Sequence, residues 1–445
     1  SYILKAFEAG ADGVLVAGCH PGDCHYISGN LKAEKEVEKT KKLLDLIGIG
    51  SDRLRLEWIS ASEGEKFARV IREFTEQLRQ MGPSPLRPKA GRLETDGGTP
   101  GPGGPRSFAE EVLEGEFMWR CLGCYLCHPT CPGGLRIAEI IRTARTKAPR
   151  EEVDLMSAHG AVPLIWARMM TNPDVKPNKL GRLKGVDVAS KGDVMFFVGC
   201  MPLFEVEFED LALNSTRVVL DAIRILNKIG IKPAVSAEER CCGHDLLWTG
   251  DFENFEKLAR MNVKAIEETG AKTVITACPE CYRTLKVDYA DLLGGLDFEV
   301  KHISEVIYEA LQEGKLKLEK EVPVKATYHD SCRLGRHMGI YEEPRAILKA
   351  IPGLTLLEME RNREEAACCG MSSWLLCGEV SKRLQLERLK EAKATGADTM
   401  VVGCHKCRIH FSCVQNEKVP PGYEDVKDIK VVDLVELVAE ALGLR

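Results

Sequence analysis

The sequence feature that most constrains the fold is a pair of adjacent cysteines followed by glycine, which occurs twice and each time precedes a Cys-x-x-Cys motif. With one cysteine further upstream, each copy makes a set of five. The first set is Cys200, Cys241, Cys242, Cys278 and Cys281, and the second set is Cys332, Cys368, Cys369, Cys404 and Cys407. The two sets keep similar internal spacing, and a repeat this long is typical of duplicated domains rather than a solenoid. We therefore expect two related domains.

Each set contains two cysteines that follow a short strand-like run, directly or after one residue. The runs are VMFFVG before Cys200, TVITA before Cys278, KATYHD before Cys332 and TMVVG before Cys404. In an open parallel sheet the carboxyl ends of neighbouring strands meet at one crevice, so cysteines far apart in sequence converge there. Amphipathic helical patterns such as 213–229 alternate with these runs. The sequence therefore predicts two α/β units, each with a shared cysteine site.

Composition limits the functions that remain. The chain has 445 residues with 18 cysteines, and we expect no secretory signal, so metal ligands or redox groups in a cytoplasmic protein are favoured over disulfides. A formal charge of −6 without a strongly basic segment argues against a nucleic-acid partner. No apolar run approaches the roughly 18 residues that a spanning helix requires, so we expect no transmembrane segment.

A third cysteine pattern lies at 119–132, which reads WRCLGCYLCHPTCP and is called the ferredoxin-type run below. Cys121, Cys124, Cys127 and Cys131 match C-x2-C-x2-C-x3-C-P, the spacing with which thiolates bind a cubane [4Fe-4S] cluster. Zinc sites usually place two Cys-x-x-Cys pairs further apart. In two-cluster ferredoxins the fourth cysteine binds the other cluster, so either Cys131 closes its own cluster or another cysteine completes it.

Two other interpretations of the five-cysteine sets stay open. The paired cysteines could be buried free thiols that pack in a core. Zinc could take four thiolates from a set, although tetrahedral zinc has no use for the fifth. Gly243 and Gly370, which follow the pairs, permit positive φ or close backbone approach.

The rest of the chain divides by composition. Residues 81–106 are rich in Gly and Pro with few apolar residues, which predicts a flexible tether. Before it, strands at 14–17 and 54–59 and a helix near 33–47 predict an α/β fragment that carries Cys19 and Cys24. The predicted domains are 1–80, a linker at 81–110, a mainly helical ferredoxin-like domain at 111–190, and α/β units at 191–321 and 322–445.

The five-cysteine pattern resembles the cysteine-rich CCG domain of the catalytic subunit of heterodisulfide reductase. CPECYRTLKVDY and YHDSCRLGRHMGIYEEPR resemble the form of this subunit that is fused to its ferredoxin-like partner, and WRCLGCYLCHPTCPGGLRIAEII is similar to the second cluster run of that partner. The resemblance implies a noncubane [4Fe-4S] cluster in each of the two sets and one cubane [4Fe-4S] cluster in the ferredoxin-type run.

The N-terminal stretches GADGVLVAGCHPGDCHYISGN and RLRLEWISASEG resemble the delta subunit of methyl-viologen-reducing hydrogenase. That resemblance implies electron transfer from a hydrogenase or formate dehydrogenase to a flavin-containing heterodisulfide reductase subunit. Cys19 and Cys24 match two of the cysteines that bind a [2Fe-2S] cluster in the full-length delta domain. We expect only the second half of that domain here.

These resemblances imply a disulfide reductase. The ferredoxin-type run would relay electrons, and the ten cysteines of the two sets would form the catalytic pair that reduces a heterodisulfide such as CoM-S-S-CoB, since cleaving a disulfide takes two electrons and clusters pass one at a time. The alternatives are an electron-transfer subunit of a glycolate, lactate or glycerol-3-phosphate dehydrogenase complex, and a zinc-binding scaffold. Candidate proton donors are His244, His329, His337, His405 and His410, and candidate substrate anchors are Arg333, Arg336 and Arg408.

Overall fold

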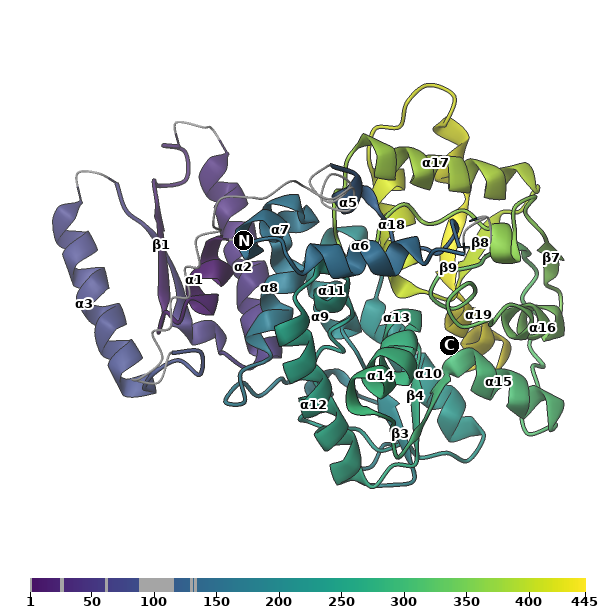
Figure 1. The fold of residues 1–445 in the computed structure, drawn as a ribbon. Helices are drawn as coiled ribbons and strands as arrows, with labels where there is room; N and C mark the ends of the chain where they lie inside the picture. The colour runs from purple at the N-terminus through teal and green to yellow at the C-terminus, as the bar shows by residue number, and fades with distance from the viewer. Residues whose placement is uncertain (1, 25–27, 61–62, 88–115, 129–130, 132–133) are drawn as a thin grey trace, which may run out of the picture. The chain divides into compact units, whose positions relative to one another are not determined.

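The computed structural model describes residues 2–24, 28–60, 63–87, 116–128, 131 and 134–445 (Figure 1). Contacts divide the chain into two compact units. Ser1–Ser107 and His159–Lys179 form the N-terminal unit, and Phe108–Ala158 and Leu180–Arg445 form the C-terminal unit. Most of the predicted tether at 81–110 falls outside the described residues, so its flexibility stays a prediction.

The N-terminal unit is built around two parallel strands. Its elements are α1 (Tyr2–Glu8), β1 (Val14–Gly18), α2 (Gly29–Ile47), β2 (Leu54–Trp58), α3 (Gly64–Met81) and α8 (Val162–Met169). Val14 of β1 lies opposite Leu54 of β2. The strands and the helix that the sequence predicts in this region are confirmed, because their apolar runs alternate with charged helical stretches.

Helix α8 belongs to the N-terminal unit although it lies inside the segment 111–190 that the sequence groups as one helical domain. Every residue of α8 is buried, so the helix needs a partner on all sides. It packs against α1, where Arg168 Nε donates to Glu8 Oε1 at 2.6 Å. The sequence has no local pattern that ties these distant helices together, and the contacts alone make the assignment.

The first α/β domain, from β3 to α15, contains a three-stranded parallel sheet in the order β3-β4-β5. Its strands are β3 (Val194–Phe197), β4 (Thr273–Thr276) and β5 (Glu299–His302). Its helices are α9 (Met201–Glu207), α10 (Ser215–Lys228), α11 (His244–Thr249), α12 (Phe252–Thr269), α13 (Pro279–Arg283), α14 (Ala290–Leu293) and α15 (Ile303–Gln312). Val218, Val219, Ala222, Ile223 and Leu226 of α10 are buried, as the periodicity of 213–229 predicts.

The second α/β domain, from β6 to α19, repeats this plan with four parallel strands in the order β7-β6-β8-β9. The strands are β6 (Lys325–His329), β7 (Thr355–Leu357), β8 (Thr399–Val402) and β9 (Lys430–Asp433). The helices are α16 (Glu342–Ala350), α17 (Glu379–Ala394), α18 (His405–Asn416) and α19 (Leu434–Ala441). The predicted α/β class and the duplication are confirmed, and all four runs before cysteines are strands.

The two α/β domains share one hydrophobic core and pack in a reciprocal way. Helix α10 of the first domain contacts α19 of the second, and α15 of the first contacts α16 of the second. By position after the strands, α10 corresponds to α16, and α15 corresponds to α19. The two contacts are therefore the same contact made twice, which is the signature of a pseudo-twofold axis. Equivalent residues of the two domains can meet at such an axis.

The described part of 111–158 is helical. It consists of α5 (Glu116–Arg120), α6 (Ile137–Arg145) and α7 (Arg150–Met156), with the ferredoxin-type run between α5 and α6. The prediction that this stretch is mainly helical is confirmed for these residues. Among the described helices, none is both long enough and apolar enough to cross a bilayer.

Candidate functional site

The first cysteine set gathers where β3 and β4 end. Cys200 caps the start of α9, Cys278 caps the start of α13, and the adjacent pair lies in the loop before α11. Thiol contacts join Cys200 to Cys241, Cys241 to Cys242, Cys242 to Cys281, and Cys281 to Cys278. The five thiols thus form one continuous chain at the carboxyl edge of the sheet, as the strand positions predict.

The second cysteine set makes the same chain of contacts in the same order. Cys332 contacts Cys368, Cys368 contacts Cys369, Cys369 contacts Cys407, and Cys407 contacts Cys404. Contacts with neighbouring thiols lower the pKa of Cys241 in the first set and of Cys369 in the second. In both sets a cysteine of the adjacent pair is therefore the one for which the thiolate is favoured.

Glycine is required after both cysteine pairs. Gly243 has φ +80°, and a Cβ there would lie 2.9 Å from the ring of Phe255. Gly370 has φ +81°, and a Cβ there would lie 2.5 Å from the backbone oxygen of Ser381. Positive φ and close approach together explain why the motif is Cys-Cys-Gly.

Polar residues that the sequence analysis missed hold the first pair in place. Asn262 Nδ2 donates to the carbonyl oxygen of Cys241, and the Tyr289 hydroxyl donates to that of Cys242, both at 2.8 Å. Asn262 Oδ1 also accepts from the backbone N–H of Arg240 at 2.8 Å. A polar residue on the buried face of the amphipathic helix α12 was the one available signal for Asn262.

In the second set, a buried histidine contacts a cysteine sulfur directly. His410 Nδ1 lies 3.3 Å from Cys369 Sγ, and the two side chains are buried. His410 is three residues after Cys407 on α18, so both reach the same site. Among the five candidate histidines, His410 has a direct contact with a cysteine sulfur.

The two cysteine sets face each other across the pseudo-twofold axis. Cys278 and Cys404, which are equivalent positions, lie within electrostatic reach. The second middle residues of the two Cys-x-x-Cys motifs are Glu280 and Lys406, and Lys406 Nζ lies 2.6 Å from Glu280 Oε2. Lys406 Nζ also lies 2.5 Å from Asp245 Oδ1. A buried ion pair thus joins the two domains at the positions where the duplicated motifs meet.

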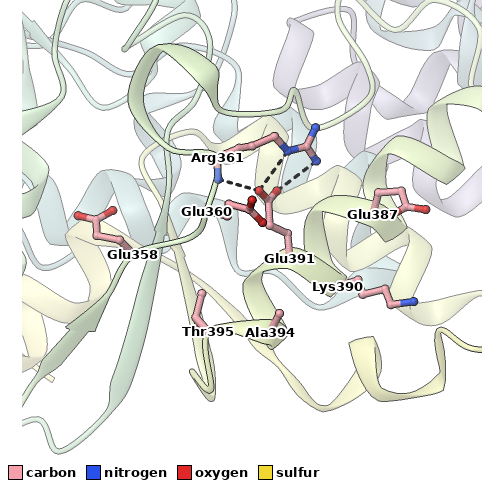
Figure 2. A pocket seen from close by; sticks show the side chains of 8 residues that line it. All are labelled: Glu358, Glu360, Arg361, Glu387, Lys390, Glu391, Ala394 and Thr395. Atoms are coloured by element: carbon pink, nitrogen blue, oxygen red, sulfur yellow. Dashed lines mark hydrogen bonds and ion pairs between the residues drawn. The ribbon is translucent and has the colours of Figure 1, made fainter.

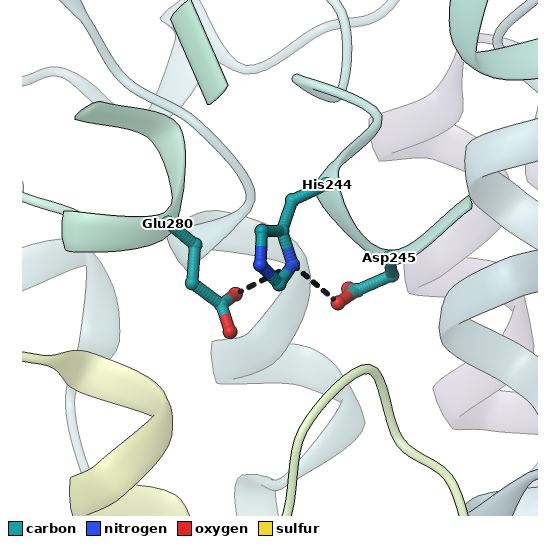
Figure 3. A group of neighbouring side chains, drawn as sticks. All are labelled: His244, Asp245 and Glu280. Carbon is teal, nitrogen blue, oxygen red and sulfur yellow. Dashed lines mark hydrogen bonds and ion pairs between the residues drawn. The ribbon is translucent and has the colours of Figure 1, made fainter. Parts of the chain in front are cut away.

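His244 extends this buried cluster. Figure 3 shows its ring between the carboxylates of Asp245 and Glu280. Arg333 Nε donates to His244 Nε2 at 2.9 Å, which leaves Nδ1–H to donate to Asp245 Oδ1 at 3.0 Å. Burial lowers the pKa of His244, so the ring is neutral. The three side chains are spaced as metal ligands would be, but the Lys406 ammonium already supplies the cation.

Each five-cysteine set has one thiol more than a tetrahedral zinc ion can bind. Tetrahedral Zn–S bonds of about 2.3 Å would place the sulfurs about 3.8 Å apart. Among the described residues, the trio His244, Asp245 and Glu280 is the one group whose His, Cys, Asp or Glu ligand atoms all lie within 4.8 Å of one another, and no three thiols of the described chain meet that spacing. The sets are therefore not arranged as a preformed tetrahedral zinc site.

The ferredoxin-type run lies against the second cysteine set. Cys127 is within electrostatic reach of Cys121, Cys124 and Cys131, so the four thiols are grouped. Contact with Cys368 lowers the pKa of Cys124 to about 5. A thiol of this run therefore touches a thiol of the second set.

Two arginines fasten the run to the second domain. Arg333 Nη1 donates to the carbonyl oxygen of Gly123 at 2.6 Å, and Arg336 Nε donates to that of Cys124 at 2.7 Å. Arg408 Nη1 pairs with Glu436 at 2.7 Å. The sequence makes these arginines candidate anchors for an anionic substrate, whereas the structure gives each of them a partner within the protein.

The remaining candidate histidines also have partners within the protein. Arg388 Nε donates to His329 Nδ1 at 3.1 Å, and His405 Nε2 lies 2.6 Å from Ser215 Oγ. His337 Nε2 lies 2.9 Å from the carbonyl oxygen of Gly123. They therefore support the loops around the cysteines and do not touch a sulfur in these contacts.

In the N-terminal unit, Cys19 and Cys24 contact each other just after β1. A surface pocket lies at the carboxyl ends of β1 and β2, and it is lined by Ala17, Gly18, Cys19, Ile59, Ser60, Glu63, Gly64 and Phe67. His20 Nε2 lies 2.6 Å from Glu63 Oε2 at its rim. The two predicted cluster cysteines of this region are thus adjacent and accessible.

A second surface pocket, on the second α/β domain, contains no cysteine (Figure 2). Its lining residues are Glu358, Glu360, Arg361, Glu387, Lys390, Glu391, Ala394 and Thr395. Arg361 Nε donates to Glu391 Oε1 at 3.1 Å, so part of its charge is neutralised internally. The pocket has none of the groups that the cysteine chemistry needs.

Two family models match this chain, one in the N-terminal unit and one in the two α/β domains. The delta subunit of methyl-viologen-reducing hydrogenase matches residues 1–82. The cysteine-rich domain matches residues 194–286 and 326–412, once in each α/β domain. The predicted resemblance to both families is confirmed.

Curated relatives match about three quarters of the chain. One subunit of the dihydromethanophenazine:CoB–CoM heterodisulfide reductase from Methanosarcina barkeri is 35% identical over 77% of this chain and 82% of its own length. One subunit of a CoM/CoB fumarate reductase from Methanothermobacter marburgensis is 29% identical over 75% of this chain and 64% of its own length. An EtfAB:quinone oxidoreductase from Syntrophomonas wolfei is 30% identical over 76% of this chain and 48% of its own length. At its N-terminus this chain carries a region that matches the hydrogenase delta subunit. Its two cysteine sets and its match to most of the Methanosarcina protein show that it belongs to the family of that heterodisulfide reductase subunit, a family of iron-sulfur oxidoreductases.

Proposed function

We propose that this chain is the disulfide-reducing subunit of an electron-transfer complex. Electrons would come from a hydrogenase or formate dehydrogenase through a flavin-containing heterodisulfide reductase-like subunit, and a disulfide such as CoM-S-S-CoB or a related thiol pair would be reduced. The observation that carries the proposal is that two complete five-cysteine sets face each other within one unit, with Cys278 and Cys404 in electrostatic contact.

The ligand assignment follows the cysteine groups. Cys121, Cys124, Cys127 and Cys131 would hold a cubane [4Fe-4S] cluster, and each five-cysteine set would hold a noncubane [4Fe-4S] cluster. When bound, these clusters supply one-electron steps and an iron position that can accept a substrate sulfur. Two facing sites suit a disulfide, because its cleavage leaves two sulfurs and takes two electrons.

The chain's own residues support an ordered entry of electrons. Because Cys124 contacts Cys368, the relay would deliver electrons to the second set before the first. Lys406, bound to Asp245 and Glu280, would hold the two sets at a fixed separation. His410, in contact with Cys369, would orient that sulfur and supply a hydrogen bond to it.

The N-terminal unit would dock the electron donor. Its match to the hydrogenase delta subunit supports a hydrogenase as the partner. Cys19 and Cys24 lie together at the end of β1, where they would contribute to a [2Fe-2S] cluster if further ligands are supplied.

The proposal is tested by anaerobic EPR of the oxidised, iron-loaded protein with and without the candidate thiols. We expect a paramagnetic signal that appears only with thiol, because a substrate sulfur would bind at a noncubane cluster. The variant Cys407→Ser should lose the signal of the second site. Cys413→Ser, which changes a cysteine of the same helix outside the set, should keep it.

An electron-transfer subunit of another oxidoreductase is the second candidate. It is supported by the relatives named as a fumarate reductase subunit and a quinone oxidoreductase, each of which matches about three quarters of the chain. On this alternative, a reduced donor would reduce all clusters, but added thiol would leave the EPR spectrum unchanged and no disulfide would be consumed.

A further inference from the structure

Two cysteines outside the three cluster patterns lie on either side of one lysine. Cys377 precedes α17, and Cys413 lies on α18. Lys382 Nζ, in the first turns of α17, lies 3.3 Å from Cys413 Sγ and also contacts the thiol of Cys377. Glu417 holds the lysine, with Oε1 2.6 Å from Nζ. These four side chains form a compact thiol–ammonium–carboxylate cluster, called the Lys382 cluster below.

The cysteines of the Lys382 cluster are more exposed to solvent than those of the two five-cysteine sets. Both of its cysteines are partly exposed, whereas eight of the ten cysteines in the two sets are buried. The thiols of Cys377 and Cys413 interact electrostatically with each other as well as with Lys382. None of the contacts of this cluster involves a cysteine of the two sets, so it is a separate thiol site within reach of small molecules.

We propose that Cys377 and Cys413 form a reactive dithiol that exchanges with low-molecular-weight disulfides. In the first step the Cys413 sulfur attacks one sulfur of the disulfide, giving a mixed disulfide and releasing one thiol. In the second step the Cys377 sulfur attacks the Cys413 sulfur, forming the Cys377–Cys413 disulfide and releasing the second thiol. The two cysteine protons are carried away on the two thiols, so two cysteines are oxidised and one disulfide is reduced.

Lys382 assigns the order of attack. Burial keeps the pKa of both cysteines above the ordinary value, and the ammonium of Lys382 limits that rise by favouring the thiolate. Cys413 has the ammonium at 3.3 Å, whereas its thiol also donates to Glu417 Oε1 at 3.7 Å, which fixes the side chain and opposes its ionisation. Cys377 lies in the loop before α17, and because both sulfurs contact the same nitrogen, displacement of the lysine side chain allows them to meet.

The disulfide would tie together two segments that carry ligands of the second set. Cys377 ends the loop that begins at Cys368 and Cys369, and Cys413 shares α18 with Cys407. Oxidation of the Lys382 cluster would therefore restrict the loop and the helix that surround the second site. This device does not depend on which reaction the clusters perform.

The test uses the full, iron-loaded chain under anaerobic conditions with bis(2-hydroxyethyl) disulfide as the probe, a neutral compound that carries no charge for a substrate site to recognise. Free thiols are alkylated at timed intervals, and peptides are identified by mass spectrometry. We expect the Cys377 and Cys413 peptides to become cross-linked with the loss of two hydrogens, while both mixed disulfides stay transient. Stable mixed disulfides on both cysteines, or no reaction at either, would overturn the proposal.

Variants test the order of attack and the role of the lysine. Cys377→Ser should trap the probe on Cys413 at the wild-type initial rate, and Cys413→Ser should slow modification of Cys377. Lys382→Met should slow modification of Cys413 by about tenfold at neutral pH, since fewer thiolates are present. Lys382→Arg should restore most of the rate, and it keeps the assay interpretable if the Met variant folds poorly. Lys390→Met, on the same helix, should leave the rate unchanged. Equal rates in Lys382→Met and wild type would contradict the assignment of Lys382.

Discussion

The first and second α/β domains hold their cysteines in the same order of contacts but stabilise them by different means. In the first domain, Asn262 and Tyr289 bind the carbonyl oxygens of the cysteine pair and leave the sulfurs to one another. In the second domain, His410 contacts the Cys369 sulfur itself, and Cys124 of the ferredoxin-type run contacts Cys368. The duplication therefore preserved the order of the cysteine contacts while the surroundings diverged, and the two sites are not equivalent in their electrostatics.

The axis between the two domains shows why such divergence matters. At a true twofold axis identical residues would meet, and a pair of like charges at the position of Glu280 and Lys406 would repel. The duplicated chain instead places a glutamate in one copy and a lysine in the other, which gives a buried ion pair at the place where the two sets face each other. A single chain can therefore build an interface that two identical subunits could not.

The largest effect is expected when this central cation is removed. Lys406→Met leaves Asp245 and Glu280 buried without their cation, and we expect a loss of about 3–5 kcal/mol in the free energy of unfolding. Trp374 Nε1 donates to Asp245, so tryptophan fluorescence during chemical denaturation reports on the site. Lys390→Met, an exchange outside the axis, should change the value by less than about 0.5 kcal/mol.

A charge exchange sharpens that prediction. The double variant Glu280→Lys with Lys406→Glu keeps opposite charges at the axis and should recover part of the stability that Lys406→Met loses. Partial recovery is expected, because Asp245 would then face a glutamate at 406. If Lys406→Met has the same midpoint of chemical denaturation as the wild-type protein, the ion pair does not stabilise the contact between the domains.

The next largest loss of stability is expected when the polar residues that hold the first cysteine pair are replaced. Asn262→Leu leaves the carbonyl oxygen of Cys241 and the N–H of Arg240 buried without a partner, so we expect a loss of about 2–3 kcal/mol. Tyr289→Phe removes one hydroxyl and should cost about 1 kcal/mol. Chemical denaturation measures both, and an Asn262→Leu protein as stable as Tyr289→Phe would show that Asn262 is not the main support.

Alanine variants of Gly243 and Gly370 test whether the backbone after the two cysteine pairs is equally restricted. Both have positive φ, so alanine should cost about 1–2 kcal/mol at either position from backbone strain alone. Gly370→Ala should cost more than Gly243→Ala, because its Cβ meets a backbone oxygen at 2.5 Å, whereas the Cβ at 243 meets a phenyl ring that can turn. Thermal unfolding of the two variants checks the order, and a reversed order would contradict the comparison.

The smallest net effect on the stability of the unmodified protein is expected at two equivalent helix caps, because their pH dependences oppose each other. His302 begins α15, and Asp433 begins α19, each in a capping box with a glutamate three residues later. Burial lowers the pKa of His302 to about 4 and, with repulsion from Glu436, raises the pKa of Asp433 to about 7. Burial thus favours the uncharged form of both caps, but their contributions to stability change with pH in opposite directions.

The signs follow from proton binding. Between about pH 4 and 6.5 the unfolded chain binds more protons at His302 than the folded chain does, so this histidine makes stability rise with pH. Between about pH 4 and 7 the folded chain binds more protons at Asp433, so this carboxyl makes stability fall as pH rises. His302→Asn should remove the first slope and Asp433→Asn the second, each on the order of a few kcal/mol across its window, since one pKa unit corresponds to about 1.4 kcal/mol. Unfolding measured at several pH values separates them, and parallel curves for the two variants would contradict the assignment.

Much of the fold follows from local pattern. The apolar runs before Cys200, Cys278, Cys332 and Cys404 are all strands, because a short buried run bounded by polar residues can pair in a parallel sheet. The grouping of α8 with the N-terminal unit was not predicted, because a wholly buried helix gives no sign of which partner covers it. The ligand cysteines were chosen by spacing, whereas Asn262 and Tyr289 act through single hydrogen bonds that leave no motif.

The sequence by itself determined which cysteines recur, their grouping into two equivalent sets and one ferredoxin-type run, and the α/β duplication, because spacing and periodicity are properties of neighbouring residues. The tertiary structure decided how these parts meet. It pairs Glu280 with Lys406, sets Cys124 against Cys368, gives Arg333 and Arg336 to backbone carbonyl oxygens, and brings Lys382 between two cysteines outside the sets. These contacts depend on how whole domains and helices pack. Packing joins residues with no fixed separation along the chain, and for this physical reason no local sequence pattern encodes them.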